Sequence, residues 1–164
     1  MDFSIAENSI LETHYQKPFT RGLSLQKSVI TKFATDMVRE FDVRTPSVNV
    51  PVKNLSGGNK QKVIIGREFS KKTLFLLVMQ PTWGLDVGAI EYVHSKLLEA
   101  REKGVSILLI STDLEEIRKL SDRILVIYEG EIVGQANSRT SLEEIGLMMS
   151  GSKKQTAELR EEVN

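Results

Sequence analysis

The spacing of hydrophobic residues divides the chain into a helical first part and a mixed second part. Between Leu25 and Phe41, apolar residues recur every four positions, as on the buried face of an amphipathic helix. Two further segments begin with a serine suited to cap a helix, Ser4 and Ser56, and Glu7 follows the first at capping-box spacing. The segments between them contain prolines or glycines and are predicted to be irregular. Helices are therefore expected over about residues 4–13, 24–41 and 56–70.

Continuous apolar runs alternate with amphipathic segments in the second part. The runs show no polar alternation, which is typical of strands buried on both faces, and they cover residues 74–79, 105–110 and 124–128. Helices are expected between them, over 87–103 and after Asp113, where Glu116 completes a capping-box pattern. Glu129 and Gly130 then predict a hairpin, and a last helix is expected over 141–149. This order predicts a parallel α/β sheet with functional groups at the carboxyl ends of its strands.

Composition narrows the choice of function. The 164 residues contain 22 Lys and Arg and 22 Asp and Glu, so neither a net charge nor a basic cluster favours nucleic acid as a partner. There is no cysteine, which excludes a disulfide framework. The longest apolar run, 74–79, is too short to cross a bilayer, so any link to a membrane is expected to go through a partner.

The run LSGGNKQK at residues 55–62 carries the most specific chemistry. Ser56 can cap the helix that follows, and Gly57 and Gly58 leave its first amides without a Cβ in front of them. The free amides and the helix dipole favour an anion, above all a phosphate. An ordinary capped helix after a loop would show the same serine and glycines, so both interpretations remain open at this point.

Three stretches together resemble one family. LSGGNKQK, the stretch PTWGLDVGA at 81–89 and DRILVIYEGEIVG at 122–134 resemble ABC ATPases, in particular the second cassette of two-cassette ATPases that energise sugar and nucleoside importers. The resemblance implies an α/β fold, the C-terminal part of a P-loop (RecA-like) cassette, with helices on both faces of a parallel sheet. It also implies three parts: a helical signature subdomain at 1–70, the second half of the core at 71–151, and a charged tail at 152–164, expected to be frayed.

The resemblance also implies a shared nucleotide site. In this family each ATP lies between the Walker motifs of one cassette and the signature motif of another. The implied role of this chain is to donate its signature to ATP and Mg held mainly by a partner cassette, N-terminal in the same parent chain. Membrane permease subunits at the inner face of the cell membrane are the other implied partners. The residues assigned to the nucleotide are Ser56, Gly57, Gly58, Asn59, Gln61 and Asp86.

Departures from the family pattern predict that this chain's own hydrolytic site is degenerate. Met79 and Gln80 stand where the family has the Walker B Asp and Glu, and Thr112 replaces the switch histidine. A thioether is a poor magnesium ligand and an amide takes no proton from water, so no metal site is expected. Trp83 stands where relatives carry arginine, without a physical explanation from the sequence. No phosphate-cradling GxxxxGK[ST] loop occurs, so we expect a fragment of a longer protein that is inactive alone.

Other interpretations are weighed against this one. A non-catalytic dimerisation or permease-docking module is the main alternative, whereas soluble ABC proteins of DNA repair carry long coiled coils that are absent here. His14 and His94 are isolated, and His94 is expected at the surface rather than as a ligand. The acidic group Asp113, Glu115 and Glu116 is expected to cap a helix rather than to catalyse. A core sheet lacking its Walker A strand is expected to expose apolar surface and to self-associate.

Overall fold

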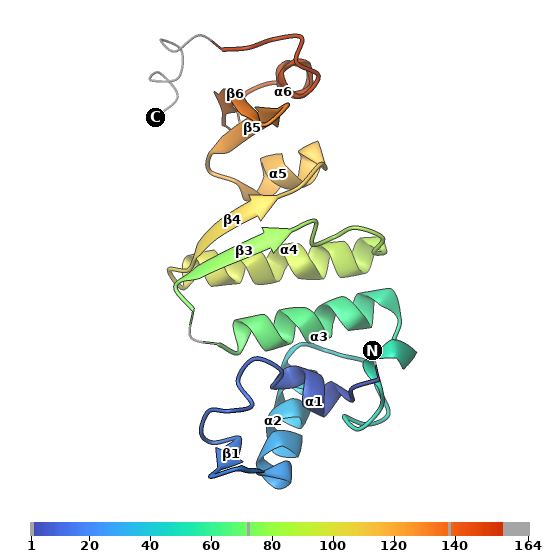
Figure 1. Cartoon of the computed structure of the whole chain (residues 1–164). Helices are drawn as coiled ribbons and strands as arrows, with labels where there is room; N and C mark the ends of the chain where they lie inside the picture. The colour runs from blue at the N-terminus through green and yellow to red at the C-terminus, as the bar shows by residue number, and fades with distance from the viewer. Residues whose placement is uncertain (1, 72, 138, 156–164) are drawn as a thin grey trace. The chain divides into compact units, whose positions relative to one another are not determined.

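A computed structural model describes residues 2–71, 73–137 and 139–155 (Figure 1). The described residues fall into two compact units, of which the first comprises Met1–Leu76 and Pro81–Ser106 and the second Leu77–Gln80 and Ile107–Asn164. The first unit contains four α-helices and a short 3₁₀ helix: α1 (Ile5–Ser9), α2 (Lys27–Glu40), η1 (Val52–Asn54), α3 (Gly57–Phe69) and α4 (Val87–Glu102). The order of helices expected from the sequence is confirmed.

The helices of the first unit pack around buried apolar side chains. One cluster is formed by α1, α2 and the segments beside them: Ala6, Ile10, Phe19, Ile30, Ala34 and Val48. Gly66 lets α3 lie close to α2, because a Cβ at this position would stand 2.9 Å from Met37 Cγ. Val63 and Val93, at 1% exposure each, are buried on α3 and α4. Burial of this apolar surface holds α3 against its neighbours.

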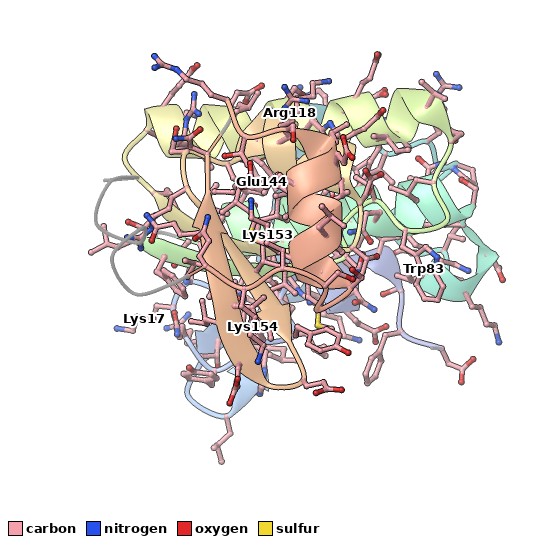
Figure 2. The ribbon with its side chains drawn as sticks, turned by 90° about the horizontal axis from the view of Figure 1, so that it is seen from above. Lys17, Trp83, Arg118, Glu144, Lys153 and Lys154 are labelled. Atoms are coloured by element: carbon pink, nitrogen blue, oxygen red, sulfur yellow. The ribbon has the colours of Figure 1, made fainter. Side chains whose placement is uncertain are left out.

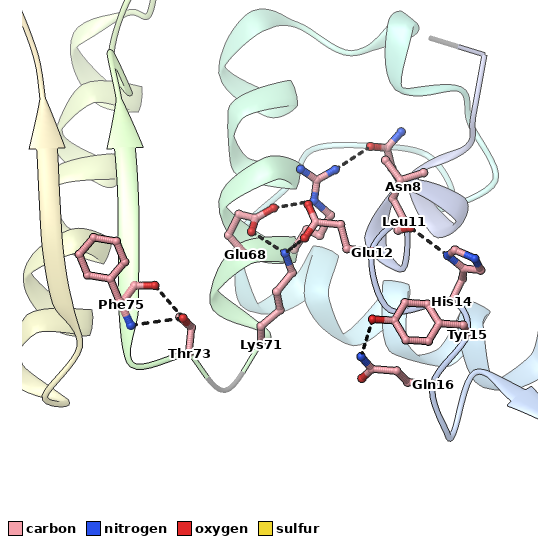
Figure 3. Close-up of polar contacts among 11 residues, drawn as sticks. Asn8, Leu11, Glu12, His14, Tyr15, Gln16, Glu68, Lys71, Thr73 and Phe75 are labelled. Atoms are coloured by element: carbon pink, nitrogen blue, oxygen red, sulfur yellow. Dashed lines mark hydrogen bonds and ion pairs between the residues drawn. The ribbon is translucent and has the colours of Figure 1, made fainter.

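Charged side chains link the C-terminal end of α3 to α1 and to the segment after it (Figure 3). Lys71 Nζ pairs with Glu12 and lies 2.6 Å from Glu68 Oε2, and Arg67 Nη1 lies 3.5 Å from Asn8 Oδ1. The hydrogen bond and charge of Lys71 lower the pKa of Glu12. Burial opposes the charged form of Lys71, but its two carboxylate partners leave its pKa raised.

Two predicted helix boundaries in the first unit are wrong. The long helix begins at Lys27 rather than near 24, because β1 (Thr20–Arg21) and β2 (Ser24–Leu25) form a small antiparallel pair around Gly22, which has a φ of +63°. The first helix ends at Ser9 rather than near 13, although its capping box is confirmed.

The expected surface position of His94 is also wrong. His94 lies on the inner face of α4, one position after Val93, and is 6% exposed.

The paired strands β3 (Phe75–Met79) and β4 (Ser106–Ile110) run parallel, as predicted. Ser106 N donates to Leu74 O (2.9 Å) at their beginning, and Gln80 N donates to Ile110 O (2.8 Å) at their end. The expectation that both faces are buried is wrong. Alternate side chains of the two strands are exposed on one face: Phe75, Leu77, Met79, Leu108 and Ile110. In the part of the chain that the structure describes, no element covers that face.

The third predicted strand, β5 (Ile124–Tyr128), does not join this sheet. It pairs antiparallel with β6 (Glu131–Ala136), which confirms the predicted hairpin. Glu129 and Gly130 have φ values of +49° and +82°, and two successive positive φ angles are typical of a tight hairpin turn that matches strand twist. The α/β class is confirmed, but the single parallel sheet with helices on both faces is not found among the described residues.

Two helices complete the second unit, α5 (Leu114–Leu120) and α6 (Leu142–Met149). Asp113 caps α5 through Oδ1, which accepts from Glu115 N and Glu116 N. The predicted capping box is only half formed, because Asp113 N donates to Ser111 Oγ (3.0 Å). The α6 helix packs on the hairpin with Ile145 and Met148 buried, and it ends near Gly151 as predicted.

The segment after α6 is more ordered than predicted. Lys153 Nζ lies 2.6 Å from Glu144 Oε1 (Figure 2), and Lys153 N donates to Leu147 O. Gln155 N donates to Val133 O (2.9 Å), and its side-chain amide exchanges hydrogen bonds of 2.7 and 2.8 Å with the backbone of Gln135. Residues 153–155 are therefore bound to α6 and β6 rather than frayed. The rest of the predicted tail lies outside the described residues.

Candidate functional site

The N-terminus of α3 forms the candidate site, in the first unit. Ser56 has an extended backbone (φ −62°, ψ 161°) and its Oγ accepts from Asn59 N, which confirms the predicted cap. Ser56 and Gly57 are both exposed. A Cβ built at Gly57 would meet no atom within 4 Å, so the backbone there faces open space. Exposed amides at a helix start, with no side chain over them, are suited to hold a phosphate.

Asn59 links the cap to another part of the chain. Its Nδ2 donates to Ser56 Oγ (2.9 Å), and its Oδ1 accepts from Arg44 N (2.7 Å). The sequence had assigned Asn59 to the nucleotide, but its side-chain amide is engaged within the chain. Arg44 was missed, because its contribution is a backbone amide that leaves no pattern in the sequence.

Gly58 and Asp86, both assigned from the sequence, lie together. Asp86 caps α4 through Oδ1, which accepts from Ala89 N (2.9 Å). A Cβ at Gly58 would stand 3.3 Å from Ala89 Cβ and 3.9 Å from Asp86 Oδ2. Gly58 thus permits the close approach of α3 and α4, and it brings the start of α4 beside the start of the signature helix.

Gln61 and its neighbour Lys62 hold loops rather than extend into the candidate site. Gln61 Nε2 donates to Pro81 O (2.9 Å), which fixes the loop after β3 against α3. Lys62 Nζ lies 2.7 Å from Asp42 Oδ2 and 4.6 Å from the centre of the Tyr92 ring. Burial and the nearby Asp42 carboxylate raise the pKa of Tyr92 to about 12, so the ring stays neutral beneath the lysine. Neither Lys62 nor Tyr92 was singled out from the sequence, because charge and aromatic side chains distant in the chain carry no shared motif.

The Walker B and switch positions lie in the second unit, at the ends of β3 and β4. Met79 is 71% exposed and Gln80 has a φ of +47°. Gln80 Nε2 donates to Thr112 Oγ1 (3.1 Å), and Thr112 N makes a longer contact of 3.5 Å with Gln80 Oε1. The strand ends therefore bring Gln80 and Thr112 together as the sequence predicted, as a neutral pair. Over residues 2–71, 73–137 and 139–155, no group of three or more His, Asp and Glu could hold a metal ion.

Trp83 follows these positions in the chain and belongs to the first unit. Trp83 is 88% exposed (Figure 2). It follows Thr82, which is buried, and precedes Gly84, which has a φ of +72°. The structure shows no packing role for it.

Comparison with curated proteins shows extensive similarity along almost the whole chain. The guanosine import ATP-binding protein NupO of Bacillus subtilis is 48% identical over 158 residues, which cover 96% of this chain and 31% of the relative. The nucleoside import ATP-binding protein NupA of Lactococcus lactis is 43% identical over 92% of this chain and 30% of its own length. The ribose import ATP-binding protein RbsA of Oceanobacillus iheyensis is 39% identical over 82% of this chain. The chain belongs to the ABC ATPase family.

Solved structures agree on the fold. A dimeric ATP-binding cassette in a post-hydrolysis state with ADP and Pi has a TM-score of 0.68 and 24% identity, over 85% of this chain and 58% of that one. No protein-family model matches the chain. The chain spans about a third of the length of the curated ABC relatives it matches. Among its described residues, none of the helices has the length and apolar character needed to cross a membrane.

Proposed function

We propose that the chain is part of the ATP-binding subunit of an importer for a nucleoside or a sugar, and that it donates its signature residues to ATP held by another cassette. The observation that carries the proposal is the open helix start, where Ser56 and Gly57 are exposed and a Cβ at Gly57 would meet no atom within 4 Å. The import activities named for NupO, NupA and RbsA support the choice of process.

The chemistry of donation follows from the groups at the start of α3. Amides near Gly57 and the Ser56 hydroxyl can donate to the terminal phosphate of ATP, where negative charge must be held during hydrolysis. The helix dipole adds a favourable field at the same place. Asp86, beside Gly58, lies at the edge of this surface, where a partner cassette would meet it. ATP and Mg would be bound mainly by that partner, N-terminal in the same parent chain.

The chain's own Walker positions support a one-sided role. Magnesium prefers hard oxygen ligands, which the Met79 thioether does not provide. The Gln80 amide bonds to Thr112 and offers no carboxylate to take a proton from water. The same neutral pair also favours the alternative, a non-catalytic module for dimerisation and for docking on permease subunits at the inner face of the cell membrane.

A chimera separates the two functions. This chain replaces the 158-residue segment that it matches in NupO, and ATP turnover is measured by phosphate release. Gly57→Asp places a carboxylate where the phosphate would lie, and loss of a preorganised donor costs about 100- to 1,000-fold in rate. Gly146→Asp is the matched control, because a Cβ at that helical glycine also meets no atom within 4 Å.

The outcomes are distinct. Turnover that falls with Gly57→Asp, but not with Gly146→Asp, supports signature donation. Restoring Met79→Asp and Gln80→Glu should not rescue the loss, because those positions belong to the opposite nucleotide site. If Gly57→Asp leaves turnover within about twofold, far from the range for a lost donor, the chain is a docking module and Ser56 is an ordinary cap.

A further inference from the structure

The Ser56 hydroxyl receives two hydrogen bonds from the same residue. Asn59 N lies 3.4 Å from Ser56 Oγ, and Asn59 Nδ2 lies 2.9 Å from it. A hydroxyl has two acceptor lone pairs and one proton. With both lone pairs facing donors of Asn59, the proton is left to point toward another acceptor.

The direction of the Asn59 amide is set by the chain itself. Its oxygen faces Arg44 N at 2.7 Å, and a backbone N–H can only donate. The opposite orientation would place the amide NH₂ against this N–H, donor against donor. The amide nitrogen must therefore face Ser56, and a backbone group 15 residues earlier in the chain determines which groups the hydroxyl meets.

We propose that Asn59 is a positioning residue that turns the Ser56 hydroxyl proton outward, so that the signature presents a donor to a phosphoryl oxygen. The inference rests on the proposed function, and it names the chemical character of the ligand group. An anionic oxygen with free lone pairs fits the outward proton, whereas an ammonium group, which can only donate, does not. Asn59 acts through Ser56 and need not touch the nucleotide.

Asn59→Asp is the informative substitution. One carboxylate oxygen can still accept from Arg44 N, so the link to that segment is kept. The other oxygen accepts where Nδ2 donated, and it draws the Ser56 proton inward. Positioning therefore predicts a loss of turnover greater than the added charge alone would cause, whereas a role limited to the Arg44 link predicts only the effect of the charge. The loss of a single oriented hydrogen bond is expected to be up to about tenfold.

A double-mutant cycle removes the effect of the added charge. The NupO chimera is prepared with Ser56→Ala, Asn59→Asp and both changes, and kcat and KM for ATP are measured separately. The charge of Asp repels phosphate whether residue 56 is serine or alanine. Only serine, however, has a hydroxyl proton that Asp can turn inward. We expect Asn59→Asp to lower kcat about tenfold more with Ser56 than with Ala at that position.

Each result decides between the claims. Equal losses from Asn59→Asp in the two backgrounds would overturn the positioning role while leaving signature donation intact, provided Ser56→Ala itself lowers kcat. If Ser56→Ala has no effect, this inference fails, because the hydroxyl is then not a donor to the nucleotide; signature donation by the backbone amides is decided separately by Gly57→Asp. Far-ultraviolet circular dichroism and the thermal midpoint check that the variants fold. Asn59→Leu removes the hydrogen bonds to Ser56 and Arg44 without adding a charge, and it should lower kcat less than Asn59→Asp does.

Discussion

Two glycine-to-alanine substitutions are expected to change stability in opposite directions. Gly66 lies in α3 on the face that packs against α2, where a Cβ would stand 2.9 Å from Met37 Cγ and 3.2 Å from Phe41 Cδ2. Met37 and Phe41 are buried, so neither side chain can move into solvent. Gly146 lies inside α6, and a Cβ there would meet no atom within 4 Å.

The magnitudes follow from two opposing effects. Alanine is favoured over glycine within a helix by about 0.8–1.0 kcal/mol, at either position. Overpacking a buried contact costs about 1–3 kcal/mol, and only Gly66→Ala meets such a contact. Gly66→Ala should therefore lower the free energy of unfolding by about 1 kcal/mol, while Gly146→Ala should raise it by nearly the same amount.

Urea unfolding followed by circular dichroism measures both changes. The prediction requires a lower urea midpoint for Gly66→Ala and a higher one for Gly146→Ala. If Gly66→Ala stabilises the chain as Gly146→Ala does, the close contact between α3 and α2 is refuted.

Three further changes test other parts of the structure. Gly151→Ala should lower the free energy of unfolding, measured by urea titration, by about 3 kcal/mol. Gly151 has a φ of +73°, and a Cβ there would overlap the Tyr128 ring. An unchanged urea midpoint would rule out that contact. Lys71 lowers the pKa of Glu12 from 4.5, so their contact stabilises the fold above that pH and is lost as the pH falls through the lowered pKa. Glu12→Gln should remove this pH dependence, and in neutral solution it should lower the free energy of unfolding by less than about 1 kcal/mol. An acid-unfolding curve identical to that of the unsubstituted chain would contradict this. The exposed face of β3 should cause self-association that Leu77→Lys weakens; light scattering that finds a monomer at every concentration counts against it.

Local signals in the sequence predicted local structure well. Ser4, Ser56 and Asp113 were expected to cap helices, and each accepts a hydrogen bond from the first turn that follows it. The reason is that a cap depends on residues within one turn of each other. The hairpin at Gly130 was predictable for the same reason, since its turn needs two residues with positive φ.

Features that depend on distant residues were not predictable. An apolar run such as 74–79 indicates a strand but does not say which of its faces is covered, and Leu77 is exposed here. His94 was expected outside because an isolated histidine has no partner pattern, yet α4 buries it. The link between Arg44 and Asn59, and the binding of Gln155 along β6, join backbone groups to side chains across the chain, and no residue spacing encodes them.

The contact between the signature and the terminal phosphate can be measured directly. The NupO chimera is trapped with ATP and vanadate, which takes the place of the transferred phosphoryl group, and ultraviolet light then cleaves the backbone next to the vanadate. Signature donation predicts a break within residues 56–58 that disappears in Gly57→Asp and persists in Gly146→Asp. Cleavage confined to the segments contributed by NupO would contradict the proposal that this chain completes the nucleotide site.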